Sequence, residues 1–294
     1  MTTFSTIGLL GRVYNDLTLR SAVRLIDFLQ SKNSKVIILE ELASLIDRQD
    51  LLNGDEDMIG EQSDLIIVIG GDGSMLGAAR SMVAHQVPVL GVNRGRLGFL
   101  TDIMPSEIEQ KVGDVLAGHY ITESRFLLDM SVVREGKTFA SGDALNDVVL
   151  HPGRYIRMID FELYIDGRFV YSQSSDGLIV STPTGSTAYA LSGGGPLMYP
   201  SMDAIVLVPL NPHTLSSRPI VVSGDSKIKL AIGKEMATSL NVTCDGQASE
   251  LVRAGDEILI TKKPLALELI HPNDHNYYET CRTKLGWGRH LTTD

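Results

Sequence analysis

The sequence predicts an α/β domain with a parallel sheet over residues 1–119 and an all-β, sandwich-like domain over residues 120–270. Three observations predict this division. Short apolar runs alternate with amphipathic stretches up to about His119, and beyond it the helical period nearly disappears in favour of short alternating runs. Residues 271–294 regain a helical pattern, so we expect this last segment to pack back on the first domain. With 294 residues, 43% of them hydrophobic, the chain is long enough to bury two cores.

The first domain has the pattern of a βαβ series. Its apolar runs are nearly continuous, which is typical of parallel strands that helices cover on both faces. In such a sheet, ligands bind beyond the carboxyl ends of the strands. We expect strands within 5–11, 35–40, 64–70 and 87–93, and helices within 19–30, 41–48, 74–83 and 105–118.

The second domain is predicted from short runs with strand character. Asp166 and Gly167 divide one of these runs and form a strong hairpin signal. The density of Gly, Ser, Thr and Pro over residues 181–196 is too high for a strand, so we expect an exposed loop there, with a short helix near Tyr189. The expected strands lie within 125–135, 161–173, 177–184, 204–210, 227–233 and 257–270.

Composition narrows the classes of partner. The chain has 26 basic and 36 acidic residues, a formal net charge of −10, and no basic run that would follow a phosphate backbone. Nucleic acid is therefore not an expected partner. The longest apolar runs are far shorter than the roughly 20 residues that cross a bilayer, and the first residues lack the features of a signal peptide. We therefore expect a cytoplasmic protein that does not bind membranes.

The cysteines and histidines do not predict a metal site or a disulfide framework. Cys244 and Cys281 are too few and too far apart for either, and we expect them to be reduced thiols. His271 and His275 would share one face of a helix, but Pro272 indicates a loop. We expect two surface histidines rather than metal ligands.

The stretch LIIVIGGDGSMLG, residues 65–77, joins an apolar strand to a helical pattern through Gly-Gly-Asp-Gly. Consecutive glycines let a backbone approach a ligand closely, and the N–H groups at a helix start favour phosphate. The stretch matches neither of the two common nucleotide fingerprints. Asp72 would repel a phosphate unless it holds a metal ion or takes a proton from an attacking hydroxyl, and both roles belong to phosphoryl transfer. The alternative is that Asp72 only caps the helix.

Two further polar segments interrupt apolar runs. Asn146 and Asp147 stand between such runs in ALNDVVL, and Asp245, Gly246 and Gln247 stand at an expected turn between strands. Each segment alone is more often an ordinary turn than a site. Together with the glycine turn and the loop at 181–196, they indicate a binding site built from several loops.

In order along the chain, these motifs resemble those of the NAD kinases. The resemblance rests on GGDGSML at 70–76, NRGRLGFLTD at 93–102, LND at 145–147, SDGLIVSTPTGSTAYALSGGGP at 175–196 and CDGQ at 244–247. It implies a phosphotransferase that moves the γ-phosphoryl group of ATP to the adenosine 2′-hydroxyl of NAD, giving NADP and ADP. GGDG also occurs in phosphofructokinases and in diacylglycerol and sphingosine kinases, whereas the TPTGSTAY loop is far more specific to NAD kinases.

The resemblance also implies roles for individual residues. Asp72 corresponds to the general base on the ribose hydroxyl, with Gly71 and Gly73 near phosphates. Asn146 and Asp147 correspond to a pair that holds the nucleotide, and Asp176 begins the long loop motif. The remaining expected contacts are Thr187, Ala188, Tyr189, Ser192 and Gln247 toward NAD, and Arg157 toward a phosphate from an adjacent subunit. Ser174 stands where some bacterial relatives have a basic residue, so no charge contact is expected there.

The expected cofactor is a divalent metal ion, Mg²⁺, because oxygen ligands and substrate phosphates suit it. Both substrates, ATP and NAD, are anions that meet an acidic protein, which makes the ion more necessary. Arg94 and Arg96 are candidates for local positive charge, the alternative being two ordinary surface arginines. The resemblance implies a homodimer or homotetramer with sites near subunit interfaces.

Two other functions stay open at this point. A lipid kinase would share GGDG, but the TPTGSTAY loop and the lack of a basic amphipathic docking helix argue against it. A sensor that binds NAD(H) or NADP(H) without catalysis is less consistent with an intact Asp72. The choices between NAD and NADH as acceptor, and between ATP and polyphosphate as donor, are also open.

Overall fold

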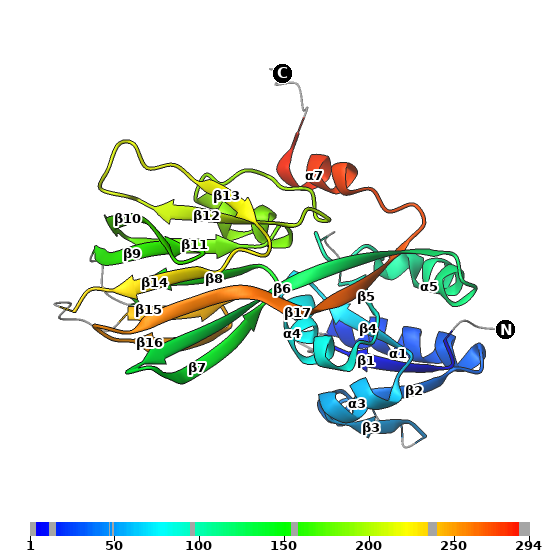
Figure 1. The fold of residues 1–294 in the computed structure, drawn as a ribbon. Coiled ribbons are helices and arrows are strands. Elements are labelled where there is room, and N and C mark those ends of the chain that lie inside the picture. The colour runs from blue at the N-terminus through cyan, green and yellow to red at the C-terminus, as the bar shows by residue number, and fades with distance from the viewer. Residues whose placement is uncertain are drawn as a thin grey trace. The chain divides into compact units, whose positions relative to one another are not determined.

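The computed structural model describes residues 4–11, 16–46, 48, 50–94, 98–153, 158–234 and 240–287. These residues form two compact units. Unit 1 holds the residues up to Ser124 and those from Leu267 onwards, and unit 2 holds Arg125–Ala266 (Figure 1). The chain passes between the units in strands β6 (Tyr120–Arg134) and β17 (Glu257–Pro272). The boundaries expected from the sequence, at 119 and 270, lie just before β6 and inside β17.

A parallel sheet forms the centre of unit 1 and confirms the predicted βαβ series. Ile7 pairs with Leu65, and Ile66 pairs with Val89, so the apolar side chains of neighbouring strands lie in line. The last residues of β17 add a strand beside β5 in the same direction. The strand order is β5 (Val89–Asn93), β4 (Leu65–Gly70), β1 (Thr6–Leu10), β2 (Lys35–Leu39) and β3 (Leu52–Gly54).

Two pairs of helices cover opposite faces of this sheet. Helices α1 (Asp16–Ser31) and α5 (Ile108–Leu116) share one core with Leu9. Helices α3 (Glu56–Gln62) and α4 (Asp72–Met82) pack on the other face, where the missing side chain of Gly8 leaves room for Ile59 of α3. The remaining short helices of unit 1 are α2 (Glu40–Ala43), η1 (Val83–His85) and η2 (Pro105–Glu107).

Strand β3 and helix α3 are not predicted by the sequence analysis. β3 has only three residues, LNG, and shows no apolar alternation. α3 buries a single large apolar side chain, Ile59, so its helical period is weak. One signal was available, because Asp55 caps the helix by accepting a hydrogen bond from the Met58 N–H over 2.8 Å.

Unit 2 consists mainly of two antiparallel sheets, which confirms the predicted β-rich domain. Side chains from both sheets, such as Phe161 and Leu230 from one and Leu150 and Val180 from the other, fill a common core. One sheet contains β6, β7 (Lys137–Ala144), β9 (Ile159–Ile165), β10 (Arg168–Ser175), β14 (Ile228–Ile232) and part of β17. The other has the order β13 (Ile220–Ser223), β12 (Ala204–Leu210), β11 (Gly177–Ser181), β8 (Asp147–His151), β15 (Leu240–Cys244) and β16 (Ala248–Val252).

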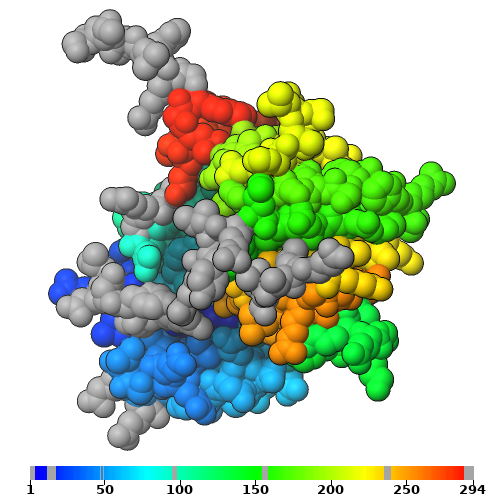
Figure 2. Space-filling view, turned by 90° about the vertical axis from the view of Figure 1, so that its left-hand side faces the viewer, coloured from blue at the N-terminus to red at the C-terminus, as the bar shows by residue number. Residues whose placement is uncertain are grey.

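The connections in unit 2 include the predicted hairpin. Asp166 and Gly167 have φ angles of 51° and 75°, so both adopt the left-handed conformation of a tight turn between β9 and β10. The connection between β12 and β13, in yellow, projects from the surface of unit 2 in Figure 2, and its Leu215 is 99% exposed. No helix in the described part of the chain is long and apolar enough to cross a membrane.

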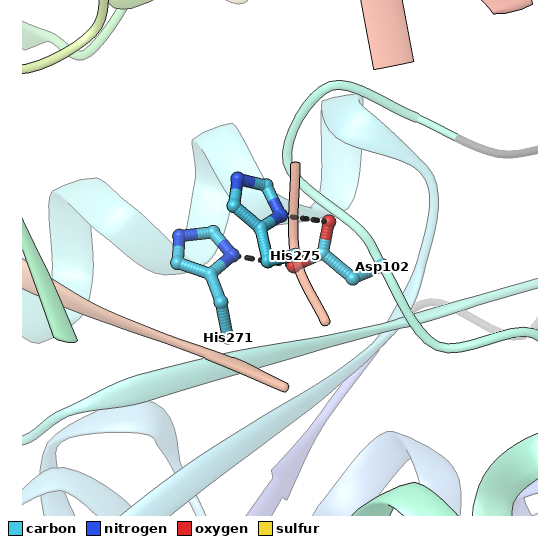
Figure 3. Close-up of side chains that lie close together, drawn as sticks. All are labelled: Asp102, His271 and His275. Atoms are coloured by element: carbon cyan, nitrogen blue, oxygen red, sulfur yellow. Dashed lines mark hydrogen bonds and ion pairs between the residues drawn. The ribbon is translucent and has the colours of Figure 1, made fainter. Parts of the chain in front are cut away.

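The end of β17 and helix α7 (Tyr277–Leu285) belong to unit 1, as expected for the last segment. The prediction of two surface histidines is wrong. His271 lies in β17, His275 lies in the turn that precedes α7, and both face Asp102 from the segment after β5 (Figure 3). Pro272 is not part of a helix, as expected, but it lies at the buried end of strand β17 and not in a surface loop.

Candidate nucleotide site

The glycine turn of unit 1 positions Asp72 as the first residue of α4. Gly71 precedes it as the N-cap residue, in an extended conformation. The carboxylate of Asp72 accepts hydrogen bonds from the backbone N–H groups of Phe99 over 3.1 Å and Leu100 over 3.0 Å. Asp72 therefore holds a segment that follows β5, and the simple helix-cap interpretation does not describe its contacts.

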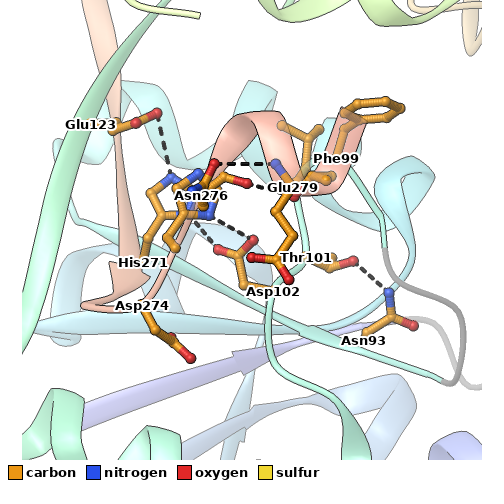
Figure 4. A network of polar contacts seen from close by, with 12 residues as sticks. Asn93, Phe99, Thr101, Asp102, Glu123, His271, Asp274, Asn276 and Glu279 are labelled. Carbon is orange, nitrogen blue, oxygen red and sulfur yellow. Dashed lines mark hydrogen bonds and ion pairs between the residues drawn. The ribbon is translucent and has the colours of Figure 1, made fainter. Parts of the chain in front are cut away.

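The segment at 98–101 approaches Asp72 so closely that it requires a glycine. A Cβ atom on Gly98 would lie 2.1 Å from Oδ1 of Asp72. The segment is also tied to the end of β5, where Nδ2 of the buried Asn93 donates to Oγ1 of Thr101 over 2.8 Å (Figure 4). These contacts fix the direction of the Asp72 carboxylate. Each carboxylate oxygen has a further lone pair available for a hydroxyl or a cation.

A cavity of about 680 Å³ lies in unit 2. Five of the residues expected at the site line it, and they come from three separate segments: Asn146 and Asp147, Asp176, and Ala188 and Tyr189. The other lining residues are Val149, His151, Pro152, Gly153, Leu210, Asn211, Thr243, Asp245 and Gly246. Sequence reasoning missed His151, the last residue of β8, and Asn211, which follows β12, because neither belongs to a recognisable motif.

The carboxyl groups of Asp245 and Asp147 both line this cavity, in different surroundings. Asp245 accepts hydrogen bonds from the backbone N–H groups of Leu145, Asn146 and Asp147, at 3.1, 2.8 and 3.2 Å. Asp147 is 5% exposed, and its burial together with the charge of Asp245 raises its pKa to about 7. Near neutral pH, Asp147 therefore exists in both protonation states, and its protonated form can donate a hydrogen bond.

The long loop that carries Ala188 and Tyr189 is fixed by buried hydroxyl groups. Residues 181–186 are buried, so the prediction of an exposed loop is wrong for this part. Oγ1 of Thr182 donates to the carbonyl oxygen of Leu145 over 2.5 Å and accepts from the N–H of Gly185 over 3.1 Å. Oγ of Ser186 donates to Pro183 and accepts from the N–H of Met198. The hydroxyl groups form hydrogen bonds with backbone groups of the protein, and for this reason so many polar residues of the loop can be buried.

The same loop contains the predicted short helix. η3 (Thr184–Thr187) leads into α6 (Tyr189–Ser192). The Tyr189 side chain is 48% exposed, although it lines the cavity. An aromatic ring in this position presents a face on which a planar ring of a ligand can stack.

Of the described residues, the other expected site residues do not line this cavity. Oγ1 of Thr187 donates to the carbonyl oxygen of Thr184 over 3.2 Å, and Ser192 is exposed. Gln247 follows the predicted turn at Asp245 and Gly246, whose φ angles are 53° and 63°. Gly73 is exposed in the first turn of α4, and Arg94 follows β5. Arg157 and Arg96 lie outside the described residues.

Comparison with known proteins identifies the family. Residues 7–120 match the model of the ATP-NAD kinase N-terminal domain, and residues 145–272 match the model of the ATP-NAD kinase C-terminal domain. The chain is 58% identical to the NAD kinase of Cellvibrio japonicus, over 99% of each chain. It is 56% identical to the NAD kinase of Pseudomonas syringae pv. syringae, over 99% of this chain and 98% of that protein.

Solved structures agree with these matches. The structure of yeast NADH kinase in complex with NADH has a TM-score of 0.90 and 26% sequence identity, and the alignment covers 98% of this chain and 90% of that chain. The structure of an NAD kinase from Archaeoglobus fulgidus in complex with ATP has a TM-score of 0.72 and 25% identity, over 96% and 97% of the two chains. The chain described here belongs to the NAD kinase family.

Proposed function

We propose a division of roles in the reaction of this family, in which the γ-phosphoryl group of ATP passes to the adenosine 2′-hydroxyl of NAD to give NADP and ADP. The chain is a phosphotransferase. The observation that best supports its use of NAD is the cavity in unit 2, because seven residues of the family motifs at 145–147, 175–196 and 244–247 line it. Its volume of about 680 Å³ is in the usual range for a nucleotide-sized ligand.

Asp72 is the proposed general base on the ribose hydroxyl. Its two bonds from backbone N–H groups orient the carboxylate, and they leave lone pairs for the proton of that hydroxyl. A carboxylate is a weak base, but the hydroxyl loses its proton late in a loose phosphoryl-transfer transition state. Orientation therefore contributes more to the rate than basicity does. Gly71 and Gly73, which flank Asp72, are proposed to lie near phosphates.

The cavity residues are proposed to bind NAD. Asn146 offers both donors and acceptors, and Asp147 donates or accepts according to its protonation state. The ring of Tyr189 is proposed to stack on a ring of the ligand, with Ala188 beside it. Asp176 contributes a carboxylate that also accepts from Nδ2 of Asn211 over 2.8 Å. Thr187, Ser192, Gln247 and Arg157 complete the proposed set of contacts.

A divalent ion, Mg²⁺, is the proposed cofactor. The phosphate oxygens of ATP are of the type that Mg²⁺ accepts as ligands, and water would supply the others. When bound, Mg²⁺ neutralises charge on the transferred phosphoryl group. The net charge of −10 makes such neutralisation more important for two anionic substrates. We also propose a homodimer or homotetramer and a cytoplasmic location.

A coupled assay tests this proposal. The purified chain is incubated with NAD, ATP and Mg²⁺, and NADP is detected with an NADP-specific dehydrogenase, with one arm containing EDTA and another containing NADH as acceptor. We expect NADP formation that EDTA abolishes and Mg²⁺ restores. Thermal stabilisation by NAD without any NADP would instead identify a sensor, and the absence of both signals would contradict the proposal.

A further inference from the structure

We propose that Asp102, His271 and His275 form a binding site for a divalent transition-metal ion, Zn²⁺ in the first instance, with a structural role separate from the phosphoryl transfer at Asp72. The three side chains come from two parts of the chain that are about 170 residues apart in the sequence. They meet inside unit 1 (Figure 3). One nitrogen or oxygen atom of each residue lies within 4.8 Å of those of the other two.

The two imidazole rings point toward one carboxylate. Nδ1 of His275 lies 3.0 Å from Oδ1 of Asp102, and Nδ1 of His271 is in contact with Oδ2 of the same group. The rings are stacked, with centroids 4.1 Å apart and an angle of 28° between their planes. A nitrogen lone pair and a carboxylate oxygen repel each other at such distances, so a proton or a metal ion lies between each pair. Because both nitrogens point toward the same carboxylate, a single metal ion could bind both nitrogens and that carboxylate.

The burial of the cluster favours an ion with direct protein ligands. The side chains of His271, His275 and Asp102 are 2%, 7% and 12% exposed. A carboxylate buried to this extent requires a hydrogen-bond donor or a cation beside it.

Glu123 supplies a second carboxylate on the far side of His271. Its Oε2 lies 3.7 Å from Nε2 of His271 (Figure 4). If Nδ1 of His271 binds a metal, Nε2 carries the proton and is nearest to Glu123, at a distance longer than a hydrogen bond. A shorter separation in the metal-bound state would give the usual arrangement of a metal-binding histidine, whose other nitrogen donates to a carboxylate. Two carboxylates and two neutral imidazoles carry a charge of −2, which one divalent ion neutralises.

The ligand types select the metal. Imidazole nitrogens suit Zn²⁺ and other late transition metals, whereas Mg²⁺ prefers oxygen ligands and retains its water. Three protein ligands leave one position of a tetrahedral zinc site for water. The ion would connect the end of β17 and the turn before α7 to the segment that follows β5. Because Phe99 and Leu100 in that segment hold Asp72, the ion would also stabilise the support of the proposed base.

The test measures metal content and binding in the full-length chain without a histidine tag, since a tag binds the same ions. Zinc is quantified after purification without chelators, removed with a chelator, and titrated back in the presence of excess Mg²⁺. We expect a single zinc ion per chain, a higher melting temperature on reloading, and the visible absorption of four-coordinate Co²⁺ when cobalt replaces zinc. A wild-type chain that neither retains nor rebinds zinc would overturn the proposal, because protons alone would then hold the cluster.

Variants assign the ligands. His275→Gln removes a nitrogen ligand and should abolish stoichiometric zinc, whereas the matched control His85→Gln, a pair partner of Asp57 elsewhere in unit 1, should retain it. Glu123→Gln alters only the outer carboxylate and should weaken zinc binding by about 10- to 100-fold. Undiminished zinc affinity in both His275→Gln and Glu123→Gln would overturn the assignment. The wild-type titration decides the proposal even if a variant fails to fold.

Discussion

The carboxylate of Asp72 is oriented by residues outside the GGDG motif. One oxygen accepts a hydrogen bond from the backbone N–H of Phe99, and the other accepts one from the backbone N–H of Leu100. Because Gly98 has no side chain, its backbone can lie close enough to Asp72 for these bonds to form. The carboxylate is thus held in one direction before any ligand arrives. Such preorganisation reduces the free-energy cost of reaching the reactive geometry.

Substitution Asp72→Asn tests the base role. The amide retains the shape of the side chain but does not accept the proton of the ribose hydroxyl, so we expect kcat for NADP formation to fall by about 10²- to 10⁴-fold. Thermal unfolding should show a folded protein. The control is Asp114→Asn on the exposed surface of α5, which should leave kcat unchanged. NADP formation by Asp72→Asn at the wild-type rate would remove Asp72 from the base role.

A pH-dependent stability is expected from Asp147. Its folded pKa of about 7 lies above the ordinary value of 3.8 that applies to the unfolded chain. The folded state therefore binds the proton more tightly, so the contribution of Asp147 to stability is fully present below about pH 4 and is lost as the pH rises to about 7. Asp147→Asn, which stays neutral, should gain stability relative to wild type between pH 4 and pH 8, by on the order of 4 kcal/mol for a shift of this size.

Denaturant unfolding at both pH values measures this difference. The control is Asp129→Asn at an exposed position of β6. If the free energies of unfolding of Asp147→Asn and wild type differ by the same amount at pH 4 and pH 8, then Asp147 titrates normally. The raised pKa would then play no part in ligand binding either.

The surroundings of a residue could be predicted where its contacts are close in the sequence, and could not be predicted where they are far apart in the sequence. GGDG places Asp72 at a strand-to-helix turn, as its pattern indicates. The partners of Asp72 lie 27 and 28 residues away, and no pattern connects them. His271 and His275 were misjudged for the same reason, because Asp102 is 169 residues from His271 in the sequence. The roles of the expected site residues stay predictions.

Buried hydroxyl groups hold the loop between β11 and β12 in place. Thr182 joins it to the end of the segment before β8, since its hydroxyl bridges the Leu145 carbonyl and the Gly185 N–H. Ser181 adds a second link, because its hydroxyl donates to the carbonyl oxygen of Asn146 over 3.1 Å. The loop that carries Tyr189 is therefore joined directly to the segment that carries Asn146, and both residues line the cavity.

Substitution Thr182→Val tests this support. Valine has nearly the same shape, but the buried N–H of Gly185 and carbonyl of Leu145 lose their partner, so we expect a loss of about 1–3 kcal/mol in the free energy of unfolding. The Michaelis constant for NAD should rise in parallel. Thr182→Ser, which keeps the hydroxyl, is the control and should stay close to wild type in both measurements. Unchanged stability in Thr182→Val would mean that the bridge contributes nothing.

Elements with strong periodicity were predictable, and short ones were not. The strands of unit 1 were expected from continuous apolar runs, and the hairpin at Asp166 and Gly167 from its turn residues. β3 was missed because three residues establish no period. The exposure of the loop at 181–186 was misjudged because polar composition was equated with contact to water, although hydroxyl groups can satisfy one another in the interior.

At the scale of the whole molecule, each unit has its own core and its own buried thiol. Cys281 lies in α7 of unit 1, and Cys244 lies in β15 of unit 2. Both cysteines are free, as predicted, so each reports the opening of its unit.

Thiol labelling is expected to distinguish the two units. Below the denaturant concentration of global unfolding, Cys281 should react faster than Cys244, because a helix near the end of a chain opens locally more readily than a strand inside a sheet. Mass spectrometry after brief labelling at several urea concentrations measures both rates, with Cys281→Ser and Cys244→Ser variants assigning the signals. Identical rates that follow global unfolding would show that the chain opens only as one cooperative unit.

Strand β17 also determines the order in which the chain can complete its fold during synthesis. Leu269 and Ile270 pair with Val89 and Leu90 in the sheet of unit 1, yet residues 125–266 are translated between them. A nascent chain that has left the ribosome as far as β5 therefore exposes one side of that strand until all of unit 2 has emerged. The sheet of unit 1 is therefore complete only after unit 2 has been synthesised, whereas N-terminal domains usually fold first.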